Sequence, residues 1–157
     1  MFGAVTLDSY AFLPRAFRTM FEAAPQFEHE PIWADFTKPL NQARIGLLSS
    51  AGIFIQGEQD GFDVERERQE PTWGDPTLRP IRSNVCQADI GATHLHIRTD
   101  DLLRDIDVAL PINRLGELVA DGRVGSGAPE HFSVMGFQQD GAEVWRTTTG
   151  PEIAARC

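Results

Sequence analysis

Two histidines, two positions apart, have the spacing best suited to chemistry. His94 and His96 lie in the run THLHIR of residues 93–98, in which apolar and polar residues alternate. Side chains two apart on a β-strand point to the same side. The pair could therefore bind a metal ion, with an aspartate such as Asp100, Asp101 or Asp105 nearby, or a substrate carboxylate. Two histidines on a strand face with ordinary hydrogen-bond partners explain the spacing equally well.

A second candidate site follows the apolar run RIGLLSSAG of residues 44–52. This run predicts a buried parallel strand that ends in a loop containing Ser49, Ser50 and Gly52. Open α/β sheets bind ligands beyond the carboxyl ends of their strands, where small residues let a ligand approach the backbone. Backbone N–H groups of this loop could hold a substrate carboxylate. Close packing of a tight turn is the simpler alternative.

His131 is a third candidate, because it follows a glycine-rich turn at residues 125–129 and opens the alternating run HFSVMGF. The run predicts a strand. At its start, His131 could act as a proton donor in catalysis, or it could simply bond to the backbone of the turn. The residues themselves favour neither interpretation.

The familiar motifs of other enzyme classes are missing from the sequence. The two cysteines, Cys86 and Cys157, are far apart and form no CxxC or Cys/His pattern, so they are expected to be reduced thiols. There is no Ser-His-Asp motif and no nucleotide-binding loop. The residues therefore indicate no cofactor, and no metal site beyond the histidine pair.

The elements that must position these residues are a helix and arm, followed by an α/β domain. Apolar residues at helical spacing predict a helix over residues 10–24, and aromatic residues among prolines predict an extended arm that includes Phe27, Trp33 and Phe36. Residues 56–87 are rich in turn formers and predict a long surface loop. A second helix is expected over residues 112–122, started by Pro111 and ended by Gly122.

The last expected helix starts at Thr149 or Gly150 and has barely two turns before Cys157. Such a helix would normally continue into another strand. The expected fold is a three-layer α/β domain with a mostly parallel sheet and an irregular N-terminal arm. We divide the chain into residues 1–43, the helix and arm, and residues 44–157, an α/β domain that is either complete or truncated at its C-terminus.

The composition argues against two kinds of partner. Fourteen Lys and Arg against 23 Asp and Glu give a net charge of -9, which repels nucleic acid and anionic lipid. No apolar run approaches the roughly 20 residues that cross a bilayer. The first residues do not have the form of a secretory signal, so the expected location is the cytoplasm.

One longer stretch resembles a known family. The segments RDID at 104–107, LPINRL at 110–115 and GRVGSGAPEHFSVMGF at 122–137 are similar to the selenoprotein B family of glycine, sarcosine, betaine and D-proline reductases. The resemblance runs from Lys38 to Cys157. It implies an oxidoreductase of amino-acid metabolism that cleaves a C–N bond beside a carboxylate or carbonyl. It also implies a small amine or amino-acid substrate and other reductase subunits as partners.

In that family a selenocysteine or cysteine, working with a nearby thiol, carries out the reduction. A selenolate stays ionised at neutral pH, where an ordinary thiol mostly does not. The corresponding residue would lie after the strand that follows the last helix, so the redox selenocysteine or cysteine is not present in this chain, and Cys157 is not assigned that role. A selenocysteine or dithiol donor is thus implied by the resemblance alone.

The resulting hypothesis is a reductase subunit or fragment that supplies scaffold and substrate-side residues. Its substrate-binding candidates are Ser49, Ser50, Gly52, His94 and His96, and His131 is the candidate proton donor. A non-catalytic binding or complex-assembly module of the same fold is the first alternative. A metal-dependent enzyme that uses His94, His96 and an aspartate is the second.

Overall fold

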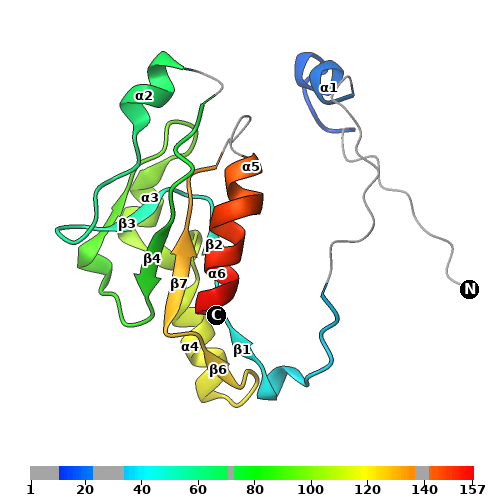
Figure 1. Ribbon diagram of the computed structural model, residues 1–157, viewed down its shortest axis with the longest axis vertical. Helices are drawn as coiled ribbons and strands as arrows, with labels where there is room; N and C mark the ends of the chain where they lie inside the picture. Colours follow the sequence, from blue (N-terminus) through cyan, green and yellow to red (C-terminus); the bar gives the residue numbers. More distant parts are fainter. Residues whose placement is uncertain (1–10, 23–33, 71–72, 137–141) are drawn as a thin grey trace, which may run out of the picture. The chain divides into compact units, whose positions relative to one another are not determined.

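The computed structural model describes residues 11–22, 34–70, 73–136 and 142–157 of the chain. It divides into two compact units, Met1–Phe36 and Thr37–Cys157, which are described separately (Figure 1). The first unit contains one described helix, α1 (Arg15–Glu22), as predicted from its apolar spacing. Pro14 precedes the first turn and accepts a hydrogen bond from the Arg18 N–H at 3.0 Å. The predicted arm residues Phe27 and Trp33 lie outside the described residues.

The second unit contains short strands that form three small sheets. The strands are β1 (Arg44–Ile45), β2 (Leu48–Ser49), β3 (Ile53–Ile55), β4 (Arg79–Arg82), β5 (Ile90–Ala92), β6 (Ser126–Gly127) and β7 (Glu130–Ser133). β1 pairs with β6 and β2 with β7 in parallel, while β3 pairs with β5 and β4 with β7 in antiparallel fashion. The α/β class is thereby confirmed, with sheets that are mixed rather than mostly parallel.

Helices and helical turns cover these sheets (Figure 1). The longer ones are α2 (Val64–Gln69), α3 (Thr99–Arg104), α4 (Ile112–Ala120) and α6 (Gly150–Arg156). Single 3-10 turns occur at Leu40–Gln42, Gln87–Asp89 and Ile106–Val108. One buried cluster, formed mainly by isoleucine and leucine, joins the strands to α3 and α4; its members are Ile53, Ile55, Ile81, Ile90, Leu102, Ile106, Leu110 and Ile112.

The predicted strand over residues 44–52 is present as two segments rather than one. β1 and β2 pair in parallel with β6 and β7, as the apolar run suggested. Leu48 is 57% exposed, however, so the strand is not buried on both faces. After β2 the chain turns at Gly52, whose φ of 66° lies in the left-handed region that favours glycine.

The predicted loop over residues 56–87 is partly wrong, because it contains α2 and β4. α2 begins where the Asp63 side chain accepts a hydrogen bond from the Arg66 N–H at 3.0 Å. Its sequence, VERERQ, has no apolar stripe, and its exposed charges pair along the helix, as in Arg66–Glu70. A six-residue helix of this kind gives no periodic signal that a sequence pattern could detect.

The predicted strand over residues 93–98 is also wrong. β5 ends at Ala92, and the two histidines lie in a bend before α3. The partner strand β3 explains the difference, because it starts at Ile53, which lies opposite Ala92, the last residue of β5. The residue before it, Gly52, lies in a turn, and the Gly52 N–H donates to the Val134 carbonyl at 3.1 Å. Residues 94–98 therefore have no neighbouring strand along that edge to pair with.

The predicted helix over residues 112–122 is confirmed as α4, with Ile112 and Leu115 buried and Gly122 beyond its end at a φ of 69°. The predicted start of the last helix is wrong. Helical structure already begins with α5 (Ala142–Val144), passes through a π-helical segment, Trp145–Thr149, and continues into α6. Thr149 has helical dihedral angles and makes no side-chain cap, which is why it does not start the helix.

Candidate functional site

The turn after β2 is held between two other segments of the chain. The Ser50 carbonyl accepts a hydrogen bond from the Gly136 N–H at 2.9 Å, and the Gly52 carbonyl accepts one from the Thr93 N–H at 2.9 Å. The Ile53 N–H donates to the Ser133 hydroxyl at 2.8 Å in a fully buried contact. The small-residue turn is therefore fixed by backbone bonds on both sides, as a rigid binding loop requires.

His94 lies against this turn. A Cβ placed on Gly136 would lie 3.2 Å from the His94 Nε2 and 3.1 Å from the Ser50 carbonyl oxygen. A Cβ placed on Gly52 would lie 3.5 Å from the His94 Cβ and only 2.1 Å from the Thr93 carbonyl oxygen. Four residues thus converge, and we call Ser50, Gly52, His94 and Gly136 the Ser50–His94 cluster. Glycine at two of the four positions lets the backbone approach the imidazole closely.

The protonation state of His94 follows from its contacts. Its Nδ1 accepts a hydrogen bond from the His96 N–H at 3.0 Å, so the neutral ring carries its proton on Nε2. Burial lowers the pKa of His94, the negative charge of Glu67 opposes that effect, and the neighbouring His96 adds to it. His94 is therefore held as a neutral hydrogen-bond donor at physiological pH.

Glu67 is the residue of this region that the sequence did not reveal. It is 2% exposed, and its Oε1 lies 3.1 Å from the His96 Nε2. Its Oε2 is buried without a hydrogen-bond partner among the described residues. Glu67 lies on α2, 29 positions before His96, within a run of charged residues that resembles an exposed helix surface. Nothing in that run distinguishes the one buried carboxylate from its exposed neighbours.

The other predicted site residues lie differently. Ser49 is buried, and its hydroxyl accepts a hydrogen bond from the Ala51 N–H at 3.3 Å, so it is used within the turn. His131, on β7, accepts a hydrogen bond from the Leu47 N–H at its Nδ1 and lines a separate cavity beside α4. The structure thus brings Ser50, Gly52 and His94 together, with His96 one hydrogen bond away, and does not add His131 to them.

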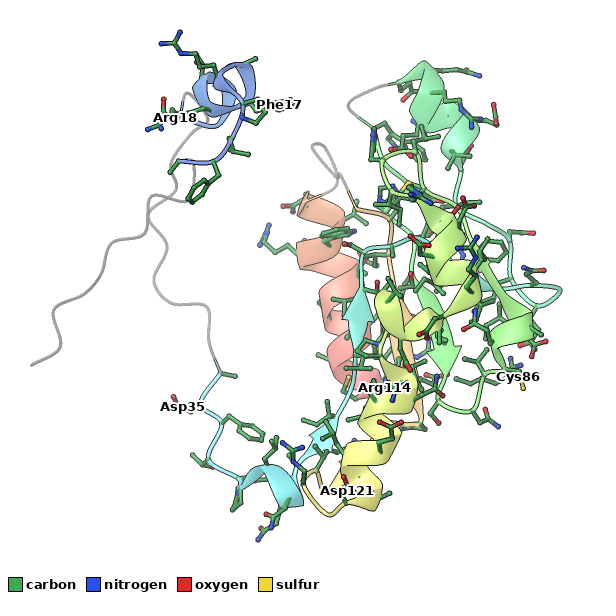
Figure 2. All side chains as sticks on the ribbon, turned by 180° about the vertical axis from the view of Figure 1, so that it is seen from behind. Phe17, Arg18, Asp35, Cys86, Arg114 and Asp121 are labelled. Carbon is green, nitrogen blue, oxygen red and sulfur yellow. The ribbon has the colours of Figure 1, made fainter. Side chains whose placement is uncertain are left out.

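The described residues offer little for a metal ion or a redox centre. In this part of the chain no group of three His, Cys, Asp or Glu side chains is arranged to hold a metal. Cys86 and Cys157 are exposed and unpaired, and Figure 2 shows Cys86 at the outer edge of its unit. Within the same described residues no helix has the length and apolar character needed to span a membrane.

The fold and the cluster define a small α/β domain in which a fixed turn of small residues faces a neutral histidine. Comparison with curated proteins places the chain near one reductase: D-proline reductase subunit gamma of Acetoanaerobium sticklandii is 27% identical over 124 residues. The match covers 79% of this chain and 47% of that protein, so the chain spans about half the length of the curated relative it matches. No family model and no solved structure matches the chain.

This match supports a distant relation to the D-proline reductase family. By its name, that relative is one subunit of a reductase.

Proposed function

We propose that this chain is part of a reductase that cleaves a C–N bond next to a carboxylate, with D-proline or a similar small amino acid as substrate. The observation that carries the proposal is the distant relation to D-proline reductase subunit gamma across most of the chain. In this proposal the substrate carboxylate binds at the Ser50–His94 cluster. The neutral His94 offers an Nε2–H donor at this cluster, beside the ordered backbone of the turn.

The proposed reaction balances with a dithiol as the reductant. The Cα–N bond of D-proline breaks, its carbon and nitrogen each gain a hydrogen, and two thiols become one disulfide. The product is a linear chain with an amine at one end and a carboxylate at the other. In this proposal the reducing thiol or selenol comes from outside these 157 residues, and the chain binds and orients the substrate.

The test uses the complex isolated from its native source through a tag on this chain. Supplied with D-proline and a dithiol, the complex should form the linear amino acid, detected by mass spectrometry. His94→Asn keeps an acceptor for the His96 N–H and removes the donor at Nε2, so it should reduce kcat/KM by about 10- to 10²-fold, the loss that accompanies one hydrogen bond to a charged group. His96→Gln is the matched control, because it leaves in place the His96 backbone N–H that bonds to His94.

The intact mass of the tagged chain separates the two main alternatives, after allowance for the tag. A mass above the 17.4 kDa of this sequence, with selenium present, supports a reductase that carries its own redox residue. A mass of 17.4 kDa together with an active complex means that another subunit supplies the redox residue. A complex that turns over neither D-proline nor glycine, sarcosine or betaine overturns the proposal and favours a non-catalytic assembly module.

A further inference from the structure

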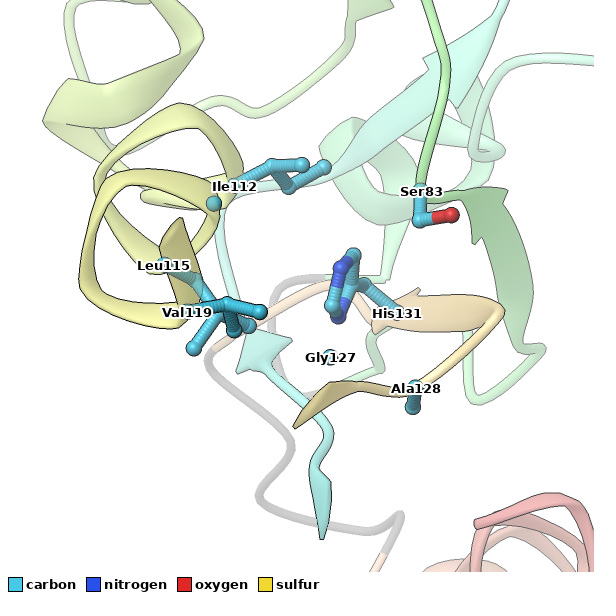
Figure 3. Close-up of a pocket in the computed structure, with 8 residues that line it drawn as sticks. Ser83, Ile112, Leu115, Val119, Gly127, Ala128 and His131 are labelled. Atoms are coloured by element: carbon cyan, nitrogen blue, oxygen red, sulfur yellow. The ribbon is translucent and has the colours of Figure 1, made fainter. Parts of the chain in front are cut away.

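A cavity separate from the Ser50–His94 cluster lies between α4 and the strands β6 and β7. Its volume is about 240 Å³. Figure 3 shows the His131 ring within it, with Ile112, Leu115 and Val119 of α4 to one side and Ser83 to the other. None of its lining residues belongs to the cluster, so an inference about this cavity does not rest on the proposed reductase function.

His131 presents a hydrogen-bond donor to this cavity. The residue is only 1% exposed, and its Nδ1 accepts a hydrogen bond from the Leu47 N–H at 3.2 Å. Since Nδ1 is the acceptor, the neutral ring carries its proton on Nε2. No acceptor for Nε2 is present among the described residues. The Nε2–H is therefore open to the cavity, where a bound molecule or water can accept its hydrogen bond.

Gly116 is the second observation, and it is independent of His131. It lines the cavity at an exposed position in the middle of α4, where glycine is less favourable than alanine. A Cβ placed on Gly116 would have no described atom within 4 Å. No packing contact among the described residues requires the glycine, and its small size leaves the mouth of the cavity beside α4 open to a ligand.

The lining defines the chemistry of the ligand. Ile112, Leu115 and Val119 provide an apolar wall, and no charged side chain lines the cavity. A charged ligand would lose hydration there without gaining an ion pair. The volume corresponds to that of roughly eight liquid water molecules, so the ligand is small.

We propose that this cavity binds a small, uncharged aliphatic molecule whose carbonyl oxygen accepts a hydrogen bond from the His131 Nε2–H.

The test is a titration of the full chain with isobutyramide, followed by NMR of the His131 imidazole and of the Ile112 and Val119 methyl groups. A ligand of this size should saturate these signals with a Kd in roughly the millimolar range. Isobutyrate has the same shape with a negative charge, and it should bind at least about tenfold more weakly. Equal or tighter binding of isobutyrate overturns the assignment of an uncharged ligand.

Two variants test the site itself. His131→Asn keeps an acceptor for the Leu47 N–H and removes the donor at Nε2, so binding should weaken about tenfold, the loss that accompanies one hydrogen bond. Gly116→Leu fills the cavity and should abolish saturable binding. Ala120→Leu adds bulk at a position of α4 that does not line the cavity and should leave binding unchanged. Absence of saturable shifts in the unmodified chain, or binding that neither site variant weakens, overturns the proposal.

Discussion

The His96 backbone N–H donates a hydrogen bond to the Nδ1 of His94 over 3.0 Å, so the shape of the bend at residues 93–98 selects the tautomer of His94. In a strand, these two groups would point in different directions and could not bond to each other. The bend therefore directs the proton-bearing nitrogen of His94 toward Ser50 and Gly136. The two histidines are therefore linked by a backbone-to-side-chain hydrogen bond, and not by two side chains that point to the same side of a strand.

Glu67→Gln should lower the pKa of His94 further. The negative charge of Glu67 raises that pKa against the larger effect of burial, and the substitution removes the charge while keeping a similar shape. The pKa is measured by NMR titration of the His94 imidazole. Glu70→Gln is the control, since Glu70 is an exposed residue directly after the same α2 helix and pairs with Arg66. A His94 pKa that rises in Glu67→Gln would show that the assigned electrostatic effect has the wrong sign.

Stability should fall as the pH decreases below about 6.5, partly because of His131. Burial lowers the pKa of His131 in the folded chain, so below its unfolded pKa the unfolded state binds the proton more readily. The loss begins near the unfolded pKa and continues until the pH reaches the lower folded value. Urea unfolding at several pH values measures it.

His131→Asn should make this pH dependence shallower. The substitution should not abolish the pH dependence, because burial also lowers the pKa of His94. His94 therefore also reduces the free energy of unfolding as the pH falls. An unchanged slope in His131→Asn would mean that His131 is as easily protonated in the folded chain as in the unfolded one.

Gly52→Ala should be strongly destabilising, by roughly 2–5 kcal/mol, because it combines an unfavourable φ with a steric clash. The φ is 66°, and the new Cβ would lie 2.1 Å from the Thr93 carbonyl oxygen. Gly57→Ala is a matched control, with a φ of 77° and no atom within 4 Å of its Cβ, and should cost only about 1–2 kcal/mol. Equal losses in free energy of unfolding would show that the contact with Thr93 is not rigid.

Ser133→Ala should destabilise the chain by about 1–3 kcal/mol, because it leaves the buried Ile53 N–H without an acceptor. Ser133 is 0% exposed, and its hydroxyl accepts that bond at 2.8 Å. Ser126→Ala, at an exposed position in β6, should change the free energy of unfolding by less than about 0.5 kcal/mol. Thermal or urea unfolding compares the two variants, and similar values for both would contradict the assigned role of Ser133.

The features that were predicted correctly from sequence have local signals. α4 has an apolar face formed by Ile112 and Leu115, a proline before its first residue and a glycine two residues after its last, all readable within twelve positions. The apolar run before Ser49 likewise indicated parallel pairing, which β1 and β2 show. Local periodicity and turn residues were sufficient for these elements.

The features that were missed depend on distant partners. Whether residues 93–98 form a strand depends on the path of the chain near Gly52, about 40 positions earlier. The burial of Glu67 depends on the fold around α2, and the π-helical segment Trp145–Thr149 has no simple sequence pattern. For the candidate site, Ser50, Gly52 and His94 were identified from residue type, whereas Glu67 and Gly136 emerge only from three-dimensional contacts.

β7 pairs with two strands that precede it by a long stretch of chain. Leu48 of β2 lies opposite Phe132, and Arg82 of β4 lies opposite Glu130. During synthesis, neither β2 nor β4 can acquire these partners until residues 130–133 have left the ribosome. Pairing over such sequence distances is slow. Until β7 is made, the unpaired edges of β2 and β4 can form hydrogen bonds with other chains and aggregate. Chaperone dependence during translation should therefore centre on the interval before β7 emerges.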